Sequence, residues 1–409
     1  FCHLSIVQRL IRVKCWLSRR HLWFHRSTAN NSRIVPDSDP QFLINPLSRQ
    51  SLYKALFQAM STHTTLPDDE RVQLLRTWLR GLPAELQIDH DSLSVASADA
   101  SFRRYFRVAT ASAPLIVMDA PPAHEDCAPF VHIAKLFGQS GVSVPSILAE
   151  DLSQGFLLLS DLGNSTYLSA LQAQPDSVPA LYKDALNALI AIQKTSTTDD
   201  LPHYDRERLL NEMMLFPQWY LGVHKNFTLS DAQTVELTNV FNTLLDNNLA
   251  QAKVWVHRDY HCRNLMLIEH NNPGILDFQD AVYGPITYDL ASLLRDAYVE
   301  WPEAQQIDWL VRYWESARAA GLAVPVAFDT FYQDFEYMGL QRHLKVLGIF
   351  ARLYHRDGKS GYLKDLPLVL KYTRQVAARY RELMPLIRLL DEVAATEKGA
   401  DSTQVGYTF

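Results

Sequence analysis

Two short stretches of this 409-residue chain carry side chains whose types and spacing suit phosphoryl transfer. The first, His257–Asn264, reads H-R-D-Y-H-C-R-N, and the second, Asp277–Asp280, reads D-F-Q-D. Phosphoryl transfer from ATP needs a carboxylate that orients the attacking hydroxyl, and two oxygen ligands that hold Mg²⁺ against the phosphates. In this pattern Asp259 is the candidate catalytic base, and Asn264 and Asp277 are the candidate magnesium ligands.

Short apolar segments beside the two motifs predict how these residues reach one cleft. Residues 254–256 predict a strand entering the first motif, residues 264–268 a strand leaving it, and residues 275–276 a strand that ends at Asp277. We therefore expect a small hairpin with both loops at one end, which would bring Asp259, Asn264 and Asp277 together. The alternative, in which these polar residues merely cap strand ends, does not explain the complete set.

The two motifs, together with the segment Tyr288–Ser292, resemble the aminoglycoside phosphotransferase group of the protein-kinase-like superfamily. The resemblance runs from about Met60 to the C-terminus. Within that group the chain is most similar to the anomeric sugar kinases of cell-wall recycling, on the segments Asp99–Arg107 and Arg352–Lys359. The resemblance implies an enzyme that uses ATP and Mg²⁺ to phosphorylate N-acetylmuramate and N-acetylglucosamine at O1 in peptidoglycan recycling. Kinases of an aminoglycoside or a small amino alcohol, and a nucleotide-binding module without turnover, stay as alternatives.

The element pattern and the resemblance together predict an α+β fold class, a bilobal protein-kinase-like fold. We expect a β-rich N-lobe over residues 60–162 and a mostly helical C-lobe over residues 163–409, joined by a hinge at Ser160, Asp161 and Leu162 whose backbone binds adenine. In the N-lobe, helices are predicted at 68–82 and 129–138, and strands within 93–108 and at 115–118 and 156–159. In the C-lobe, helices are predicted at 178–193, 207–221, 229–249, 288–295, 305–321, 328–351 and 367–390.

Residues 1–59 differ from the rest in charge, with nine Lys or Arg and two Asp, whereas the whole chain has a net charge of −6. Met60 then opens a segment with a Pro and acids at the start of a helix, as at a natural N-terminus. We expect residues 1–59 to be an upstream extension outside the fold. The alternative is a targeting segment, since no acidic residue occurs before Asp37.

The cysteines and the hydropathy pattern limit the class of protein. Cys2, Cys15, Cys127 and Cys262 are widely separated and form no C-x-x-C pair, so a disulfide framework or a zinc site is not expected and the cytoplasm fits. No run of 18 apolar residues occurs, so no membrane span is expected. The expected partners are a small sugar and ATP, with no nucleic acid and no membrane, and a monomer is favoured.

One feature departs from the kinase pattern, because the strand expected to offer an ATP-binding Lys reads L-I-V-M-D at residues 115–119. The loop Ser97–Arg104 occupies the place of a phosphate-covering loop, although an ordinary hairpin turn remains an alternative. Its candidate nucleotide contacts are Ser101, Arg103 and Arg104. Neighbouring residues on a strand face opposite sides, so only one of the two arginines can point into the cleft.

The candidate acceptor-binding residues are Arg263, Glu212, Trp219, Arg352 and Arg356. The arginines supply cations that an anionic sugar such as N-acetylmuramate would need, whereas a polycationic aminoglycoside would need carboxylates. For each arginine singly, a solvated surface charge is the alternative. We interpret His257 as structural, and Asp289 as an N-terminal helix cap that braces the catalytic loop.

Overall fold

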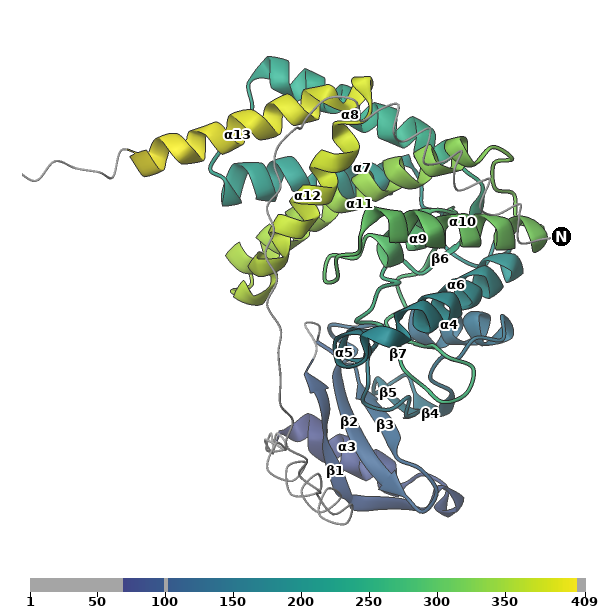
Figure 1. The fold of residues 1–409 in the computed structure, drawn as a ribbon. Coiled ribbons are helices and arrows are strands. Elements are labelled where there is room, and N and C mark those ends of the chain that lie inside the picture. Colours follow the sequence, from purple (N-terminus) through teal and green to yellow (C-terminus); the bar gives the residue numbers. More distant parts are fainter. Residues whose placement is uncertain (1–68, 99–101, 403–409) are drawn as a thin grey trace, which may run out of the picture. The chain divides into compact units, whose positions relative to one another are not determined.

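The computed structural model describes residues 69–98 and 102–402, all within the second of the chain's two units, Thr64–Phe409 (Figure 1). The expected extension 1–59, the expected start at Met60 and the candidate nucleotide contact Ser101 lie outside the described residues. The boundary expected at residues 162 and 163 follows the last strand of a sheet, and as a domain limit it stays a prediction.

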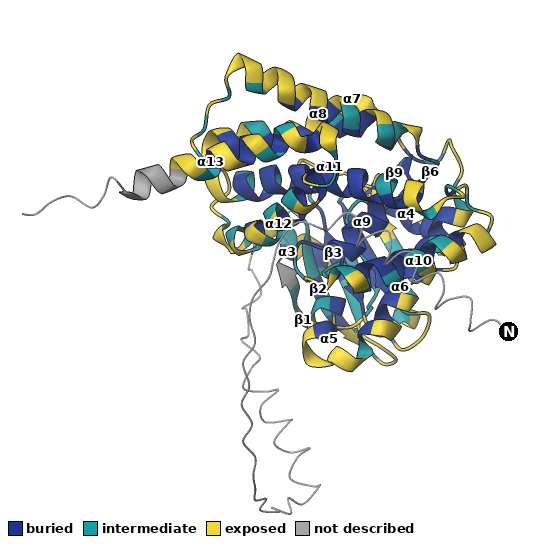
Figure 2. Ribbon diagram, turned by 45° about the horizontal axis from the view of Figure 1, so that its top comes forward, coloured by how far each residue is buried: buried dark blue, intermediate teal, exposed yellow. Residues whose placement is uncertain are grey.

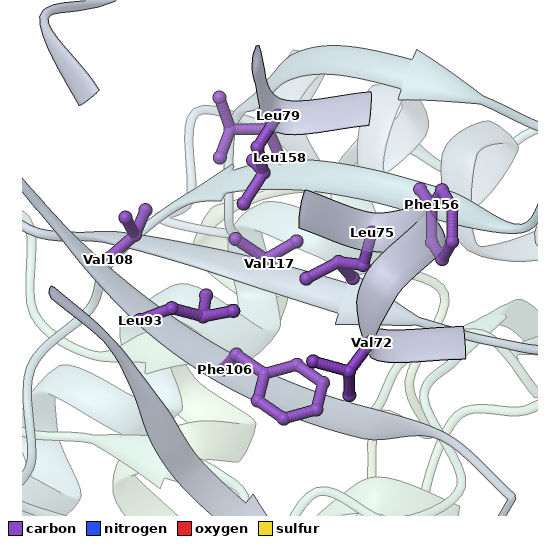
Figure 3. Packing of buried hydrophobic residues seen from close by; sticks show 9 residues of the cluster. All are labelled: Val72, Leu75, Leu79, Leu93, Phe106, Val108, Val117, Phe156 and Leu158. Carbon is purple, nitrogen blue, oxygen red and sulfur yellow. The ribbon is translucent and has the colours of Figure 1, made fainter. Parts of the chain in front are cut away.

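The first part of the described chain forms a five-stranded antiparallel sheet with the order β1-β2-β3-β5-β4. Helix α3 (Glu70–Arg80) covers one face, where its Val72, Leu75 and Leu79 pack against Phe106 and Val108 of β2 (Figure 3). Side chains alternate along a strand, so Tyr105 and Arg107 belong to the opposite face. The strands are β1 (Ile88–Ala98), β2 (Arg104–Thr110), β3 (Leu115–Asp119), β4 (Ile147–Asp151) and β5 (Phe156–Ser160).

Helix α4 (Ala128–Gln139) connects the sheet to the catalytic motifs. The ring centroid of Phe137 lies 6.1 Å from that of His257 and 6.0 Å from that of Phe278, and Phe130 lies 4.8 Å from Phe278. Phe278 is fully buried by these contacts. The apolar face of α4 therefore packs against both catalytic motifs, at His257 and at Phe278, the residue after Asp277.

The rest of the described chain is mostly helical, as expected. Helix α11 (Phe328–His355) is buried along its middle and contacts α7, α8, α9 and α12 (Figure 2). The other helices are α5 (Tyr167–Ala173), α6 (Val178–Thr195), α7 (Arg206–Met213), α8 (Asp231–Ala250), α9 (Tyr288–Leu294), α10 (Glu303–Ala319), α12 (Leu366–Ala377) and α13 (Met384–Ser402). Short helical turns are η1 (Ala84–Leu86), η2 (Pro175–Ser177), η3 (Phe216–His224), η4 (Ser360–Asp365) and η5 (Arg381–Leu383).

Two predicted helices are interrupted. The helix expected at 207–221 ends at Met213 and continues as the π-helix η3, because Pro217 lacks the N–H that an α-helix would need there. Gly348 of α11 lies against this break, where an added Cβ would be 2.3 Å from the carbonyl carbon of Leu215. The helix expected at 367–390 divides into α12 and α13, because Arg379 leaves the helical path to pair with Glu336 and Glu303.

The expected hairpin beside the catalytic loop is present in shorter form, since β7 (Leu265–Met266) pairs with β8 (Gly274–Ile275). Strand β6 (Lys253–Val256), at the expected place, pairs with β9 (Val282–Pro285), which was not expected. Strands of two to four residues are too short to show a clear hydrophobic pattern. Their pairing depends on which backbone N–H and C=O groups remain without a hydrogen bond once the tertiary structure has packed. Strand β4 and helix α5 were likewise not expected. No described helix is long and apolar enough to cross a membrane.

Candidate active site

The structure brings the three residues of the predicted catalytic set together. The Asn264 side-chain nitrogen donates to the carbonyl oxygen of Asp259 at 3.0 Å and to the Asp277 carboxylate at 3.3 Å. Gln279 donates to the other oxygen of Asp277 at 2.8 Å. Asp259 is partly buried, whereas Asp277 is exposed. The arrangement offers a carboxylate beside a pair of potential metal ligands.

The carboxylate of Asp289 holds the start of the catalytic loop by two hydrogen bonds. Its carboxylate accepts hydrogen bonds from the backbone N–H groups of His257 at 2.6 Å and Arg258 at 2.9 Å. The expected brace is present, but the expected cap is wrong, since Asp289 is the second residue of α9 and Thr287 occupies the N-cap position. Its carboxylate reaches across to the loop because the loop offers two unpaired N–H groups there.

His257 has the structural surroundings that the sequence suggested. Its Nε2 atom lies 2.9 Å from the carbonyl oxygen of Leu276, and its Nδ1 atom accepts a hydrogen bond from the backbone N–H of Asp259. Burial lowers the pKa of His257, so the ring is neutral at neutral pH. His257 therefore links the loop of Asp259 to the strand that delivers Asp277.

The backbone is strained at both motifs. Arg258 has a φ of 78° and Asp277 a φ of 62°, in the left-handed region that residues other than glycine seldom adopt. Such conformations persist only where the surroundings enforce them, and they gather at functional sites. At Arg258 the enforcing contacts are the hydrogen bond from its N–H to Asp289 and the pairing of its guanidinium with Glu212.

Glu212, Arg258 and Lys345 form a largely buried network of charges beside the catalytic loop. Glu212 pairs with Arg258 at 2.5 Å and with Lys345 at 3.0 Å, and it also accepts a hydrogen bond from Tyr204. Lys345 donates to the Tyr288 hydroxyl at 3.0 Å. Burial works to raise the pKa of Glu212, but Lys345 and Arg258 lower it overall. Both Glu212 oxygens have partners inside the protein, and its expected contact with substrate stays a prediction.

Three cations and one histidine act on the charge of Asp259. Burial works to raise the pKa of its carboxyl group, but Lys345, His261, Arg342 and Arg258 outweigh it and lower the pKa to about 2. Asp259 is therefore ionised throughout the neutral range. An ionised carboxylate accepts a hydrogen bond from a hydroxyl, and it is a weak base that orients more than it abstracts.

The two adjacent arginines face opposite sides of the sheet, as expected. Arg104 pairs with Asp69 and Asp119 on the face of α3. Arg103 pairs with Glu125 at 3.0 Å, and its side chain is 11% exposed. Burial works to lower the pKa of Arg103, but Tyr105 and the carboxylates of Glu125, Asp277 and Asp280 raise it. Arg103 is thus the arginine on the side of the catalytic carboxylates.

The hinge residues are tied to the sheet by their side chains. Arg107 of β2 binds both carboxylate oxygens of Asp161, at 2.5 and 3.0 Å. The Ser160 hydroxyl accepts from the backbone N–H of Ser146 at 2.9 Å. Together with Leu162, they border an open hollow of about 610 Å³, whose other walls are residues 142–146 and 267–270. Asp259, Asn264 and Asp277 do not line this hollow.

The predicted acceptor-binding residues lie in different surroundings. The Arg263 guanidinium lies 3.6 Å from the ring centroid of Tyr298 and 3.9 Å from Asp365. Trp219 is half-buried on η3. Arg352 is half-buried, and burial lowers its pKa. Arg356 is exposed and pairs with the neighbouring Asp357 at 2.7 Å.

Two cations near Asp259 were not among the predicted site residues. Arg342 and Lys345 lie three residues apart on α11, and both are buried, at 3% and 6% exposure. Residues at this spacing share a helix face. Two cations one turn apart within the helix predicted at 328–351 are a signal that the sequence contains.

The chain is similar to known proteins over most of its length. Residues 92–324 match the phosphotransferase enzyme family. The N-acetylmuramate/N-acetylglucosamine kinase of Neisseria meningitidis serogroup B is 49% identical over 338 residues, which cover 82% of this chain and 98% of that protein. The protein of the same name from Pseudomonas putida is 47% identical over 334 residues, covering 80% and 98%.

A solved structure gives the same fold at much lower identity. The ethanolamine kinase of Plasmodium vivax superposes with a TM-score of 0.55 at 10% identity, covering 85% of this chain and 99% of that one. A match at this identity concerns the fold alone, and it agrees with the expected bilobal, protein-kinase-like architecture.

Proposed function

Since this chain belongs to the phosphotransferase enzyme family, we propose that it transfers a phosphoryl group from ATP to the anomeric hydroxyl of N-acetylmuramate and N-acetylglucosamine. The products are the sugar 1-phosphates. The observation that carries this proposal is the 49% identity to a kinase named for both sugars, over 98% of that kinase's length. The set of Asp259, Asn264 and Asp277 supports it, because all three are present and adjacent.

Asp259 performs the central step in the proposed mechanism. Its ionised carboxylate accepts the hydrogen bond of the anomeric hydroxyl and so points the oxygen at the γ-phosphorus of ATP. As the bond from sugar oxygen to phosphorus forms, the bond from phosphorus to the departing ADP oxygen breaks, and the hydroxyl proton passes to Asp259. An anomeric hydroxyl is more acidic than an ordinary alcohol, so a carboxyl group of low pKa suffices.

Asn264 and Asp277 are the proposed holders of Mg²⁺. Amide and carboxylate oxygens are the hard ligands that this ion prefers, and the ion commonly takes only one or two from the protein and the others from phosphates and water. The two side chains fit this, since they are adjacent and Asp277 is exposed. Because the Asn264 nitrogen donates to Asp259 and Asp277, we assign the amide oxygen to the metal. When bound, Mg²⁺ would neutralise charge on the phosphates of ATP.

Arg103 is our candidate for the cation that replaces the missing ATP-binding Lys. Its pairing with Glu125 mirrors the ion pair between a Lys and a Glu in other kinases. The carboxylates of Asp277 and Asp280 are close enough to raise its pKa, so it lies toward the proposed metal site. Arg104, held by Asp69 and Asp119, is assigned a structural role instead. Ser101 and the hinge backbone at Ser160, Asp161 and Leu162 remain proposed nucleotide contacts.

The acceptor contacts are proposed with different support. Arg263 lies in the catalytic loop, two residues after His261, whose ring contacts Tyr298. The Arg263 side chain is partly exposed, which suits contact with the lactyl carboxylate of N-acetylmuramate. Trp219 is proposed to cover a sugar face, whereas no contact among the described residues supports substrate binding by Glu212, Arg352 or Arg356.

We propose that the enzyme acts as a monomer in the cytoplasm, in peptidoglycan recycling. The proposed location rests on the small number of cysteines.

The test is to incubate the purified protein with ATP, Mg²⁺ and each candidate acceptor, and to locate the phosphate by NMR. We expect phosphate on O1 of both amino sugars. Turnover of an aminoglycoside or amino alcohol, with none on either amino sugar, would contradict the proposal. Nucleotide binding without turnover of any acceptor would indicate a binding module.

A further inference from the structure

Three buried polar atoms of residues linked to the catalytic loop have no hydrogen-bond partner among the residues that the structure describes. They are Nη1 of Arg342, Nδ1 of His261 and Oδ2 of Asp365. An unpaired buried polar atom costs free energy, and native proteins keep few of them. These three come from α11, the catalytic loop and η4, so no single strained element explains them. Each is tied to the loop, because the charge of Arg342 acts on Asp259, His261 belongs to the loop, and Oδ2 of Asp365 lies 3.9 Å from the guanidinium of Arg263.

Their neighbours form one connected set of side chains. The charge of Arg342 acts on Asp259, on His261 and on Tyr298. The His261 and Tyr298 rings are 5.3 Å apart at their centroids. The Arg263 guanidinium lies over the Tyr298 ring and 3.9 Å from Asp365. The three atoms thus belong to a connected set of polar and aromatic side chains that includes the catalytic loop.

Arg342 is the most unusual member of this group. It is 3% exposed, yet it forms no salt bridge with any residue that the structure describes. Lys345, one turn along the same helix, is equally buried but is paired with Glu212. A buried cation that keeps an unpaired N–H is costly without a ligand, and the cost is offset when an acceptor atom binds there.

We propose that Arg342 determines acceptor specificity by donating its unpaired Nη1–H to the acetamido carbonyl oxygen on C2 of the sugar. This inference rests on the proposed function. The acetamido group is attached next to the anomeric carbon, whose hydroxyl Asp259 binds. Arg342 lies one turn from Lys345 on α11, and Lys345 pairs with the same Glu212 as Arg258, the residue before Asp259. The acetamido group is also common to both proposed sugars. We assign the lactyl carboxylate, which only N-acetylmuramate has, to the more exposed Arg263.

The experiment must separate contact with the acceptor from support of Asp259. The 1,5-anhydro analogue of N-acetylglucosamine lacks O1 and keeps the acetamido group, so its binding does not depend on Asp259 holding the hydroxyl. Its Kd is measured by calorimetry with ADP and Mg²⁺ present, beside that of 1,5-anhydroglucitol, which lacks the acetamido group.

We expect Arg342→Met to weaken binding of the acetamido analogue roughly 10–100-fold, the range for a hydrogen bond to a charged group, and to leave 1,5-anhydroglucitol unchanged. Arg342→Lys keeps the buried charge without the forked set of donors, so its Kd for the acetamido analogue should lie between those of the wild type and Arg342→Met. Arg388→Met, at an exposed pair on α13, is the matched control and should match the wild type.

Equal binding of the acetamido analogue by the wild type and both Arg342 variants would overturn the inference, even if their kcat fell. An equal loss for the two analogues would overturn it as well. If Arg342→Met does not fold, the Lys variant decides. Failure of the proposed function is distinguishable, because the wild type would then phosphorylate neither amino sugar.

Discussion

The catalytic loop and the pair of arginines at the start of β2, Arg103 and Arg104, are held in different ways. The loop is held by fully buried groups, with Asp289 and Asp296 each accepting from its backbone N–H groups. The arginine pair depends on ion pairs between side chains from separate elements, Arg103 with Glu125 and Arg104 with Asp69 and Asp119. The Arg104 side chain is 29% exposed.

This difference has an energetic consequence. Buried charges are poorly screened, so removing one partner leaves an uncompensated charge and a large loss. The pair of Arg104 with Asp69 is partly exposed and is screened by water and salt, and the buried Asp119 keeps Arg71 as a second partner when Arg104 is removed. Changes around the catalytic loop should therefore have larger effects on stability than changes at the arginine pair.

The largest effect is expected at the centre of the loop. Asp259→Asn removes the carboxylate that orients the hydroxyl, and it should lower kcat roughly 10²–10⁴-fold. Nucleotide binding, measured by calorimetry with Mg²⁺, should persist because Asn264 and Asp277 remain. An undiminished kcat would show that Asp259 is not the base.

The buried network should come next. Lys345→Met leaves Glu212 with one cation fewer, and we expect a loss of stability of roughly 3–5 kcal/mol. Adding Glu212→Gln leaves the buried Arg258 without its carboxylate partner and should lower the stability further, measured by urea unfolding. The kcat of the double variant should stay low, because Lys345 is the cation that lowers the Asp259 pKa most. A double variant with full activity would contradict the network's role in positioning Asp259.

The arginine pair offers a smaller and sharper test. Arg103→Met should raise the KM for ATP by about tenfold, the loss of roughly one charged hydrogen bond, with little change in stability. Arg104→Met should leave that KM unchanged and lower stability by about 1 kcal/mol, because Arg71 still compensates the charge of the buried Asp119. The two residues are adjacent and chemically identical, so each controls for the other. The reverse result would exchange their assigned roles.

The smallest effect concerns pH. Burial raises the pKa of Asp289 to about 6, despite the opposing influence of His257 and the two hydrogen bonds. As pH falls through that value, the carboxyl takes up a proton and loses acceptor strength toward the loop. We expect kcat/KM to fall a few-fold between pH 7 and pH 5 for this reason, since Asp259, with a pKa of about 2, stays ionised.

Asp289→Asn supplies the control for this pH effect. It cannot titrate, so its profile should lack the decrease near pH 6, while ATP titrates equally in both proteins. Its kcat/KM should be lower than that of the wild type at neutral pH, because one of two acceptor oxygens is lost. Superimposable profiles would assign the decrease to another group.

The catalytic motifs were accurate predictors because their geometry is local. Asp259 and Asn264 are five residues apart in one loop, so their proximity hardly depends on the rest of the chain. Helix α3 was predicted within two residues at each end, from apolar residues at helical spacing. The pattern was weakest where tertiary contacts select the outcome. The pairing of β6 with β9 and the break between α12 and α13 are examples, the latter set by Arg379 reaching two glutamates of other helices.

The sequence alone determined the chemistry of this protein: an α+β kinase-like fold, Asp259 as candidate base, and Asn264 and Asp277 beside it. It did so because a phosphoryl-transfer loop needs particular residue types at short, fixed spacing. Only the tertiary structure decided which arginine faces the catalytic carboxylates, that Glu212 has internal partners, and that the charges of Lys345 and Arg342 act on Asp259. Those relations join residues about 45 to 175 positions apart, where packing rather than spacing sets the distance.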